Sequence, residues 1–592
     1  MPTMATRRRL AALTVGVGLL LGTVGPVAAS DISFSGAGWG HGVGLSQFGA
    51  KAMGADGASY EQILHRYFTG VGIAPIATAG AGTFLANDPK PLWVGLLQDS
   101  GMVSFTVESG PANLCFDPAD ACVNTAQPGQ RFRFGPDGTG NCVFLRLTAT
   151  GESTVVGFPG SCDASVRPLA AQTTLTVPFK ARSYRHGILR FRQSPITGGL
   201  HTVYEIGIDH YMRGLSEVPD SWPTAAIEAQ VVVSRSYAVW HALDRGDEGT
   251  FSLARRGDCS CNLFDDASDQ VFRGWTGESS HPNWVSAVSS TAGQVMASDG
   301  KVALGLYSSS SGGATENYAD VFVNGTHPHL TTVIDSPAFA DAAANPHTSW
   351  GAGYDQRTLA GSFGFSWVSN AEVVERNDSG SAKTVRLVGI VDGQRVETTV
   401  TGVEMRAALS LRSTTFDIVV TPRFEDVSVG DHFASEILGL HDLGITSGCS
   451  LVRFCPERAV TRGEMAAFLV RTLGLSVADG VNPFTDDDGH DLEAEISALW
   501  ASGITSGCTP TQFCPERAVT RAEMAAFLVR GFGLAASDTD SFTDDDQHFF
   551  ESEISALWAS GITSGCTPTQ FCPERAVTRA EMAAFLIRSL SG

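Results

Sequence analysis

The sequence is short of positive charge. It holds 40 Lys and Arg residues against 62 Asp and Glu residues, which gives a net charge of −22 at pH 7. The acidic residues are concentrated in the last third of the chain. Because a surface of this charge repels the phosphates of nucleic acids and of anionic lipids, we expect neither a nucleic acid nor an anionic membrane surface as a partner. The charge is compatible with a neutral or basic polymer as a partner, or with a polymer that specific pockets bind.

Beyond its first thirty residues the sequence also lacks a long apolar run. No later stretch reaches the roughly 20 apolar residues that a transmembrane helix needs. The first thirty residues have the order of a secretory signal peptide, which we place at 1–29: Arg7–Arg9 precede the apolar segment Leu10–Val27, and Val27–Ala29 offers small residues for cleavage. We therefore expect an exported, soluble mature protein without a membrane span.

The 12 cysteines fall as pairs of close neighbours, which suits an exported protein. Local disulfides are the first interpretation and metal ligands the second. Because a gap of one residue strains a disulfide, the pair Cys259/Cys261 is the doubtful one. The other pairs are Cys115/Cys122, Cys142/Cys162, Cys449/Cys455, Cys508/Cys514 and Cys566/Cys572.

A chain of 592 residues is too long for one hydrophobic core, so we expect two to four domains. Short alternating runs between 83 and 211, separated by Gly, Pro and Asp, predict a β-rich part in which we expect no chemistry. Helical and strand-like segments follow, and the chain from Phe424 is a repeat. The predicted fold class is α+β: a mixed, β-rich catalytic-type domain with a buried central helix, followed by an all-α threefold repeat module.

The segment His210–Trp240 is the centre of the candidate functional site. Glu217 lies in a short turn rich in Gly and Pro, and a run of small apolar residues, Ala225–Ala238, follows it. Apolar residues fall on all sides of this run, which predicts a buried helix with Ser221 as N-cap and Pro223 in the first turn. A lone acid directly before a buried helix that contains an Arg is typical of a functional site.

Two glycine-rich loops are candidates for the remainder of this site. In the first loop, glycines at positions 36 to 44 surround His41. Because Gly lets the backbone approach a ligand closely, His41 is a candidate contact, and a tight turn is the alternative. The second loop, Ser308–Glu316, is rich in hydroxyl groups and Gly, which can hydrogen-bond a sugar or a backbone.

From Phe424 the chain repeats itself three times with a period of 58 to 60 residues. We place the repeats at 424–473, 484–532 and 542–590. Each repeat predicts two amphipathic helices, and a T-R-x-E motif at the second helix matches a capping box, with Thr as N-cap and Glu as its partner. Capping explains the Thr and the Glu. The Arg is extra, and three of them in one module could grip an anionic polymer.

The repeats resemble S-layer homology repeats, through the motifs TRGE (461–464), TRAE (520–523) and TRAE (578–581). Modules of that family anchor exported proteins non-covalently to secondary cell-wall polymers. The resemblance covers 424–592 and implies such a polymer as a partner. The candidates for binding it are Arg462, Arg521 and Arg579. The internal Cys pair of each repeat departs from the general pattern.

Residues 31–421 resemble the SpoIID/LytB family of peptidoglycan proteins. The motifs that carry this resemblance are YMRGLSEVPDSWPTAAIEAQVVVSRSYA, YSSSSGGATE and LSLRSTTF. A fourth motif, GWGHGVGLSQFGA, follows the LSLRSTTF-like strand in the family but lies at 38–50 here. This order indicates a circular permutation, so we expect Phe34–Gly44 beside Ser410–Phe416. The parts of this domain are then the permuted segment 31–82, the β-rich part 83–211 and the core 212–421.

The sporulation members of this family are lytic transglycosylases, and their catalytic acid falls on Glu217. One acid suffices because the substrate's own C6 hydroxyl attacks the anomeric carbon: the acid protonates the leaving oxygen and then accepts the hydroxyl proton. Glu217 must then be protonated near neutral pH, so we expect burial among groups such as Val218 and Trp222 to raise its pKa. The start of the following helix, and Arg235 if it lies close, would lower it.

The resemblance also implies the other residues of the site. Polar residues of the family's helix fall on Gln230 and Arg235. Some members hold a metal with Cys and His between helix and strand, but Cys259 and Cys261 have no His close by, so we assign no metal and no cofactor. The substrate-binding candidates are Arg235, Gln230, Ser309, Ser310, Glu316 and His41.

Two interpretations compete with the enzyme. LytB-type members are described as enhancers of an N-acetylmuramoyl-L-alanine amidase, so a non-catalytic enhancer with an amidase as partner is the alternative. A structural surface protein that uses only the repeats is the other. Glu217, Gln230 and Arg235 together favour a lytic transglycosylase that acts on peptidoglycan glycan strands over the enhancer. The Glu217 turn and the SSSGG loop, both present, argue against the structural protein. Each interpretation implies a secreted protein of the cell wall or cell surface.

Overall fold

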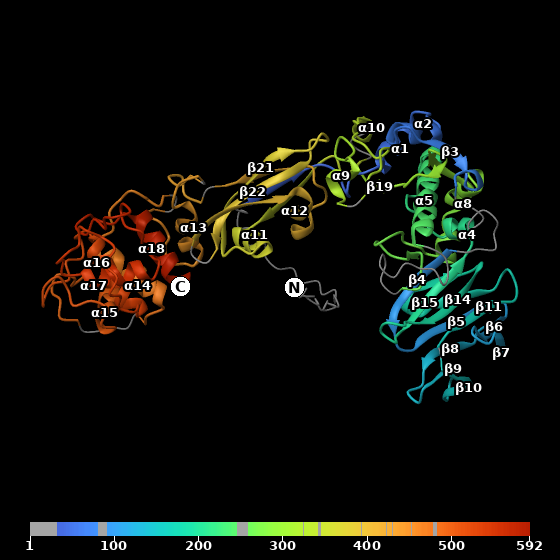
Figure 1. The fold of residues 1–592 in the computed structure, drawn as a ribbon, viewed down its shortest axis with the longest axis horizontal. Coiled ribbons are helices and arrows are strands. Elements are labelled where there is room, and N and C mark those ends of the chain that lie inside the picture. Colours follow the sequence, from blue (N-terminus) through green and yellow to red (C-terminus); the bar gives the residue numbers. More distant parts are fainter. Residues whose placement is uncertain are drawn as a thin grey trace.

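The chain forms three regions that follow one another along its long axis (Figure 1). A β-sandwich lies at one end, a region with three-stranded sheets in the middle and the helical repeats at the other end. The predicted signal peptide lies outside the described residues. The computed structural model describes residues 32–80, 92–160, 162–245, 259–323, 325–340, 345–391, 394–421, 423–428, 430–450, 453–476 and 482–591.

The predicted β-rich part is a sandwich of two sheets. One sheet has the strand order β16-β4-β15-β14-β11-β6-β7 and the other β10-β9-β8-β5-β12-β13. Alternating apolar side chains of both sheets, such as Phe105, Phe134 and Phe191, fill the space between them. The strands are β4 (Leu92–Ser100), β5 (Val103–Ser109), β6 (Ala112–Phe116), β7 (Ala121–Ala126), β8 (Arg131–Pro136), β9 (Asn141–Thr148), β10 (Gly151–Pro159), β11 (Ala164–Pro168), β12 (Thr174–Val177), β13 (Arg182–Tyr184), β14 (Gly187–Gln193), β15 (Leu200–Ile206) and β16 (Leu263–Phe264).

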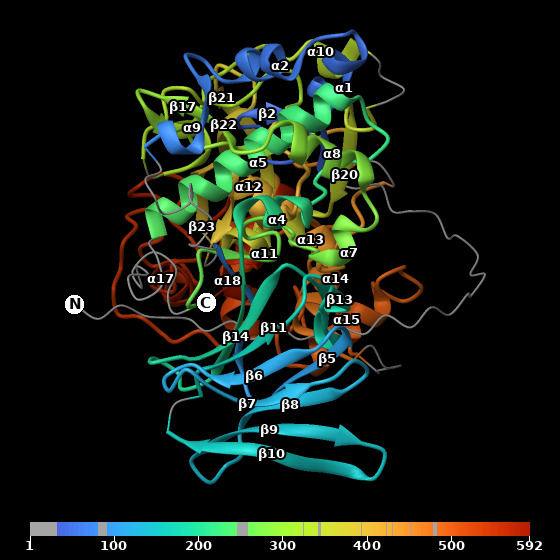
Figure 2. The same cartoon turned by 90° about the vertical axis from the view of Figure 1, so that its right-hand side faces the viewer.

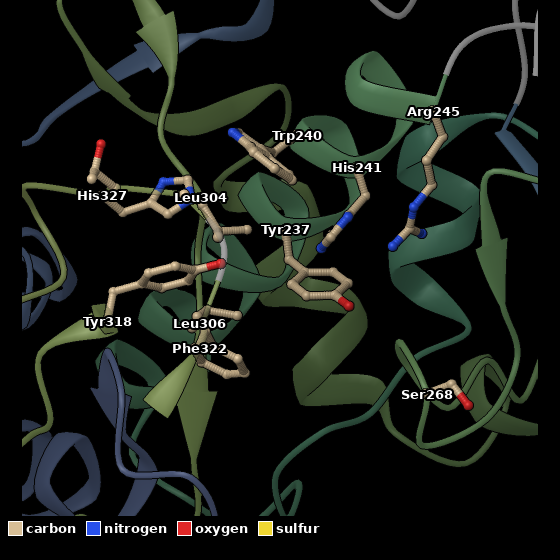
Figure 3. Close-up of a pocket in the computed structure, with 12 residues that line it drawn as sticks. Tyr237, Trp240, His241, Arg245, Ser268, Leu304, Leu306, Tyr318, Phe322 and His327 are labelled. Atoms are coloured by element: carbon tan, nitrogen blue, oxygen red, sulfur yellow. The ribbon is translucent and has the colours of Figure 1, made fainter. Parts of the chain in front are cut away.

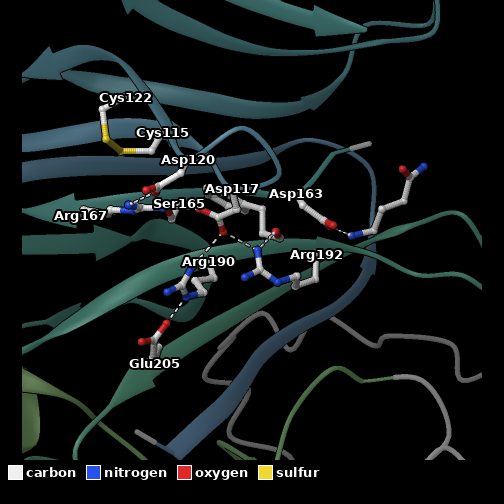
Figure 4. A network of polar contacts seen from close by, with 12 residues as sticks. Cys115, Asp117, Asp120, Cys122, Asp163, Ser165, Arg167, Arg190, Arg192 and Glu205 are labelled. Atoms are coloured by element: carbon white, nitrogen blue, oxygen red, sulfur yellow. Dashed lines mark hydrogen bonds and ion pairs between the residues drawn. A yellow bond between two sulfur atoms is a disulfide. The ribbon is translucent and has the colours of Figure 1, made fainter. Parts of the chain in front are cut away.

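A polar network ties neighbouring strands of the seven-stranded sheet together (Figure 4). Its centre is Asp117, whose carboxylate accepts hydrogen bonds from Ser165 and from three arginines. Burial raises the pKa of this carboxyl, but the hydrogen bonds from Ser165, Arg192 and Arg167 outweigh burial and lower the pKa to about 2. The network therefore stays charged and holds the register of β6, β11 and β14.

The central helix α5 (Thr224–Arg245) is buried on all sides, as its sequence predicts. It begins later than expected: the carbonyl of Pro223 accepts the first helical hydrogen bonds, from Ala226 and Ile227, so Pro223 and not Ser221 occupies the N-cap position. Figure 2 shows α5 between the sandwich and the helices of the permuted segment. The helices around it are α1 (Gln47–Ala55), α2 (Tyr60–Tyr67), α4 (Ile208–Arg213), α7 (Trp275–Glu278) and α8 (Pro282–Ser290).

The permuted segment closes the middle region. Its first strand, β1 (Ile32–Gly36), pairs with β20 (Trp350–Tyr354) on one side and with β24 (Phe416–Val420) on the other. The N–H of Gly40 also donates to the carbonyl of Arg412. The expected contact between Phe34–Gly44 and Ser410–Phe416 is thereby confirmed.

Short elements complete the region between α5 and the repeats. The three-stranded sheet β21-β22-β23 packs on helix α11, and helix α12 follows its last strand in the chain. The elements are β2 (Leu45–Ser46), β3 (Gly72–Pro75), β17 (Gln294–Ser298), β18 (Lys301–Val302), β19 (Tyr307–Ser308), α9 (Tyr318–Val321), α10 (Pro337–Ala340), α11 (Gln356–Phe363), β21 (Trp367–Arg376), β22 (Ala382–Val391), β23 (Gln394–Thr401) and α12 (Gly402–Leu409).

Each repeat contributes two helices, and the second of each begins with the predicted capping box. The repeats are joined by isolated β-bridges as well as by helix packing, for example Thr461 with Ala518 and Thr520 with Ala576. The chain as a whole is thus mixed α and β with many sheets. The repeat helices are α13 (Ala434–Asp442), α14 (Arg462–Leu473), α15 (Glu493–Ala501), α16 (Arg521–Phe532), α17 (Glu551–Ala559) and α18 (Arg579–Ser591).

The structure bears on two sequence expectations: the disulfide pairs and the absence of a membrane-spanning helix. All six neighbouring cysteine pairs form disulfides, including the doubtful Cys259–Cys261. Among the helices of the described residues, none is both long and apolar enough to cross a membrane.

Candidate functional site

The turn that carries Glu217 lies between α4 and α5. Its backbone is strained at Ser216, whose φ of 88° falls in the left-handed region that side chains other than Gly rarely adopt. Such strain persists only where surrounding structure enforces it, and it gathers at functional sites. The turn therefore fixes the direction in which the Glu217 side chain points.

The carboxyl of Glu217 changes its protonation state near neutral pH. Burial raises its pKa from 4.5 to about 7, against the opposing effects of a hydrogen bond with Tyr307, the charge of Arg273 and the backbone of Val271. Its Oε1 atom is buried without a hydrogen-bond partner among the described residues. The expected rise in pKa is confirmed. The side chain can thus both donate and accept a proton near neutral pH.

The permuted segment reaches the turn through Gln47, the first residue of α1. Its Nε2 atom lies 3.4 Å from the carbonyl oxygen of Glu217 and 3.3 Å from Oε1 of Gln230. Gln230 in turn donates to Ser234 Oγ at 3.0 Å and is 1% exposed. Gln230 therefore holds the backbone of the acid turn through Gln47, and its own side chain lies inside the protein.

The two glycine-rich loops pack against each other. A Cβ atom on Gly40 would lie 2.7 Å from Ser308 Cβ, and one on Gly42 would lie 2.8 Å from Glu316 Cγ. Both glycines have positive φ, at 117° and 77°. The close approach expected toward a ligand is in fact made toward the Ser308–Glu316 loop, which explains why Gly is needed at these positions.

His41 sits within this loop contact. Its Nδ1 accepts a hydrogen bond from the N–H of Val43 at 3.0 Å, and its ring lies against Phe322. Burial, with a smaller contribution from Arg406, lowers the pKa of His41 to about 4. The imidazole is therefore neutral at physiological pH and positions the loop.

The candidates of the second loop have different surroundings. Ser310 is buried and accepts a hydrogen bond from Asn345, whereas Ser309 is half-buried and its carbonyl accepts the N–H of Phe48. Glu316 is 1% exposed and accepts hydrogen bonds from Ser379 at 2.6 Å and from Thr414. Burial raises its pKa. Glu316 thus joins the loop to the β21–β22 hairpin.

Arg235 lies inside the protein. Its side chain is fully buried, and its guanidinium donates to the carbonyls of Val288, Thr291 and Gln294. These carbonyls lie at the end of α8 and just beyond it, where a helix leaves them without helical partners. Arg235 therefore fixes α8 against α5, and its expected contact with substrate stays a prediction.

A cavity of about 660 Å³ opens along the C-terminal half of α5 (Figure 3). Trp240 and Tyr237 of α5 lie on one side of it and Tyr318 and Phe322 on the other. Leu306, which precedes Tyr307 in the chain, also lines it. Aromatic walls suit a polar ring that stacks on one face.

The arginines of the T-R-x-E motifs are buried between repeats. Each is 3% exposed and donates from Nε to a backbone carbonyl of another repeat and from Nη1 to the capping-box Glu of that repeat. The pairs run from Arg462 to Glu523, from Arg521 to Glu581 and from Arg579 back to Glu464. They close a ring of three repeats. The structure thus gives these arginines a role in joining the repeats, and their contact with a polymer stays a prediction.

The sulfur atoms of Cys259 and Cys261 are joined in a disulfide, so they do not offer thiolate ligands for a metal. In the described residues one group of carboxylates has the spacing of metal ligands, and it lies in the third repeat.

Three residues of the site are absent from the expectations. Tyr307 and Arg273 act on the Glu217 carboxyl, and Gln47 holds its backbone. Gln47 belongs to the GWGHGVGLSQFGA motif and Tyr307 to YSSSSGGATE, so the motifs contained the signal. Arg273 lies in none of the quoted motifs, so no sequence signal pointed to its role.

Two matches to known families agree with this arrangement. Residues 197–297, which include the Glu217 turn and α5, match the family described as Stage II sporulation protein, SpoIID. Residues 483–525 and 541–583 match the S-layer homology domain, SLH.

Individual relatives share shorter stretches with the chain. An endoglucanase from Bacillus sp. (strain KSM-635) is 36% identical over 94 residues, which are 16% of this chain and 10% of that protein. An S-layer protein from Bacillus thuringiensis subsp. finitimus is 27% identical over 173 residues, 28% of this chain and 21% of that protein. A protein of Bacillus anthracis described as an uncharacterized cell wall amidase is 30% identical over 141 residues, 23% of this chain and 26% of that protein.

The chain therefore spans between a tenth and about a quarter of these relatives. The S-layer homology domains and the S-layer relatives indicate a protein of the cell surface or cell wall.

Proposed function

The chain contains a SpoIID domain followed by S-layer homology domains, and from this premise we propose that it is a lytic transglycosylase of peptidoglycan, held at the wall by its repeats. The observation that carries the proposal is the carboxyl of Glu217. It is buried, its Oε1 lacks a hydrogen-bond partner in the described part of the chain, and its pKa is raised to about 7. A single acid that serves as both donor and acceptor needs these properties.

In the proposed reaction, protonated Glu217 donates its proton to the glycosidic oxygen, and the bond between that oxygen and the anomeric carbon breaks. The C6 hydroxyl of the same sugar then bonds to the anomeric carbon and gives its proton to the Glu217 carboxylate. The product is a 1,6-anhydro sugar, and the acid is regenerated without water. Tyr307 and Arg273 stabilise the carboxylate between the two proton transfers.

The aromatic cavity supports a glycan as substrate. Its volume of about 660 Å³ suits a sugar ring or two, and Trp240, Tyr237 and Tyr318 offer faces on which a ring can stack. Leu306 of the cavity wall is next to Tyr307, which hydrogen-bonds the Glu217 carboxyl.

One observation favours the alternative, a non-catalytic enhancer of an amidase. Gln230 and Arg235, which were expected to act on the substrate beside Glu217, both have their polar atoms engaged inside the protein. The site then rests on a single acid, and an amidase-binding surface needs no acid at all.

Digestion of purified glycan strands, with and without stem peptides, tests the proposal. The wild type, Glu217→Gln and Glu228→Gln are compared by mass spectrometry of the products. Glu228 is a matched control, because it lies on α5 and its carboxylate accepts a hydrogen bond from Ser290. We expect anhydro-muramic ends from the wild type and Glu228→Gln but none from Glu217→Gln.

Free reducing ends instead of anhydro ends would mean a hydrolase and would contradict the transglycosylase. A second carboxylate would then be sought, starting with Glu316→Gln. If no variant cleaves, but the wild type binds walls and accelerates an added amidase, the enhancer is the correct function.

A further inference from the structure

The three repeats differ at one buried position. Each repeat opens with Phe, one further residue and Asp, in FEDV (424–427), FTDD (484–487) and FTDD (542–545). The residue after this Asp is Val427 in the first repeat, Asp487 in the second and Asp545 in the third. All three side chains are buried, at 3%, 0% and 1% exposure. A buried Val needs no partner, whereas a buried carboxylate is costly unless a donor or a cation neutralises it.

In the second repeat, an amide supplies that partner. Asn482 Nδ2 donates to Asp487 Oδ2 at 2.9 Å and to Ser497 Oγ at 2.7 Å. Asn482 Oδ1 accepts the N–H of Phe484 at 2.7 Å, which fixes the amide orientation with its donor toward the carboxylate. The second repeat therefore satisfies one oxygen of its buried acid from within the protein.

In the third repeat, the amide is replaced by a carboxylate. Asp540 occupies the position of Asn482, and its Oδ1 accepts the N–H of Phe542 at 3.2 Å, as the Asn does. No donor is left for Asp545, and neither of its carboxylate oxygens has a hydrogen-bond partner in the described residues. Carboxylate oxygens of Asp540, Asp545 and Asp546 all lie within 4.8 Å of one another.

We propose that the third repeat binds one Ca²⁺ ion through Asp540, Asp545 and Asp546. Three carboxylates around a buried, unpartnered side chain are the hard oxygen ligands that Ca²⁺ prefers, and the exposed Asp540 and Asp546 leave room for water to complete six to eight ligands. Mg²⁺ demands closer octahedral geometry and sheds its water reluctantly, so it fits this set less well. Without a cation, burial and the nearby charge of Asp540 raise the pKa of Asp545 to about 6.

The ion would stabilise the segment between α16 and α17, where the third repeat begins. Asp540 belongs to the segment that leads from α16, whereas Asp545 and Asp546 precede α17. Arg521 and Arg579 connect this repeat to the other two. Calcium binding is therefore expected to stabilise the closed ring of repeats, independently of any activity at Glu217.

The chain itself offers matched variants for the test. Asp540→Asn reproduces the arrangement of the second repeat, so it should fold and lose the site. Asn482→Asp reproduces the third repeat in the second, where Asp488 corresponds to Asp546, and should gain a site. The full mature chain is stripped with a chelator and titrated with CaCl₂ by calorimetry, with MgCl₂ as a control titration.

We expect one calcium site in the wild type, none in Asp540→Asn and two in Asn482→Asp, with dissociation constants of about 10⁻³ M or tighter. The unfolding temperature of the repeats should rise with CaCl₂ in the wild type and stay unchanged in Asp540→Asn. If the wild type takes up no Ca²⁺, if Asp540→Asn binds it equally well, or if Asn482→Asp gains no site, the proposal is wrong. A proton shared by Asp540 and Asp545 would then be the explanation of the pair.

Discussion

Gln47 Nε2 lies 3.4 Å from the carbonyl oxygen of Glu217, although 170 residues separate the two in the chain. The permuted segment thus supplies a support of the acid turn from the other end of the domain. Since β1 is fixed between β20 and β24, the position of Gln47 depends on the closure of the middle region. The segment that carries Gln47 is therefore far from Glu217 in sequence but beside it in space.

Cleavage should depend on pH through Glu217. The proton donor is the neutral carboxyl, whose pKa is raised to about 7, so activity should hold below pH 7 and fall about tenfold per pH unit well above it. Initial rates of release of anhydro ends between pH 4 and 9 measure this profile. A plateau that ends near pH 4.5, the ordinary value for Glu, would contradict the raised pKa.

The same shift predicts a pH dependence of stability. The native state keeps a proton on Glu217 that the unfolded state loses above about pH 4.5, so the free energy of unfolding should decrease from pH 4.5 to pH 7. The full effect is on the order of 3 kcal/mol, since one pKa unit corresponds to about 1.4 kcal/mol. Urea unfolding of Glu217→Gln, which cannot titrate, should show less of this decrease than the wild type. Identical slopes for both proteins would count against the shift.

Tyr307→Phe should move the basic limb of the activity profile upward. The Tyr307 hydroxyl lowers the pKa of Glu217, so its removal leaves burial less opposed and the acid protonated to higher pH. The maximal rate should fall at the same time, because the carboxylate formed after proton donation loses a stabilising contact. Trp240→Ala is a suitable comparison: it changes the cavity wall and should raise KM while leaving the limb in place.

Gln47→Ala should reduce turnover more than substrate binding. The Ala variant removes the contacts with the Glu217 carbonyl and with Gln230, which lets the acid turn shift, and a displacement of about 1 Å can cost about a hundredfold in rate. We expect kcat to fall and KM to stay close to that of the wild type, with the thermal unfolding temperature nearly unchanged. Partial recovery in Gln47→Asn at low temperature would support a positioning role, whereas equal loss of stability and rate would indicate general unfolding.

The repeat ring can be tested with two arginines of the same repeat. Arg521 is buried between the second and third repeats, whereas the side chain of Arg517 is 44% exposed and pairs with Glu523 of its own repeat. Arg521→Ala should destabilise the module by about 3 kcal/mol, as expected for a broken buried pair, and Arg517→Ala by less than about 1 kcal/mol. Denaturant unfolding of both variants measures the difference. Equal, small effects would mean that the ring does not hold the repeats together.

Local patterns sufficed for much of the fold. The capping boxes at Thr461 and Thr520, the six disulfides and the strands between 92 and 206 depend on residues that are close in sequence, and the structure has them. The same holds for the buried helix after Glu217, although the N-cap shifted to Pro223. The motif order, with GWGHGVG at the start, even fixed which distant segments must meet.

The sequence by itself determined the buried helix after Glu217 and the threefold module, because apolar periodicity and repeat spacing are written along the chain. The raised pKa of Glu217 depends on burial, which the tertiary structure decides. Only the tertiary structure decided what the long polar side chains touch. Arg235 and Arg521 have sequence surroundings that suit a ligand site, yet both are buried against backbone carbonyls of other elements. A guanidinium bonds to whichever acceptors the packing of distant segments brings within reach, and no local pattern encodes that choice.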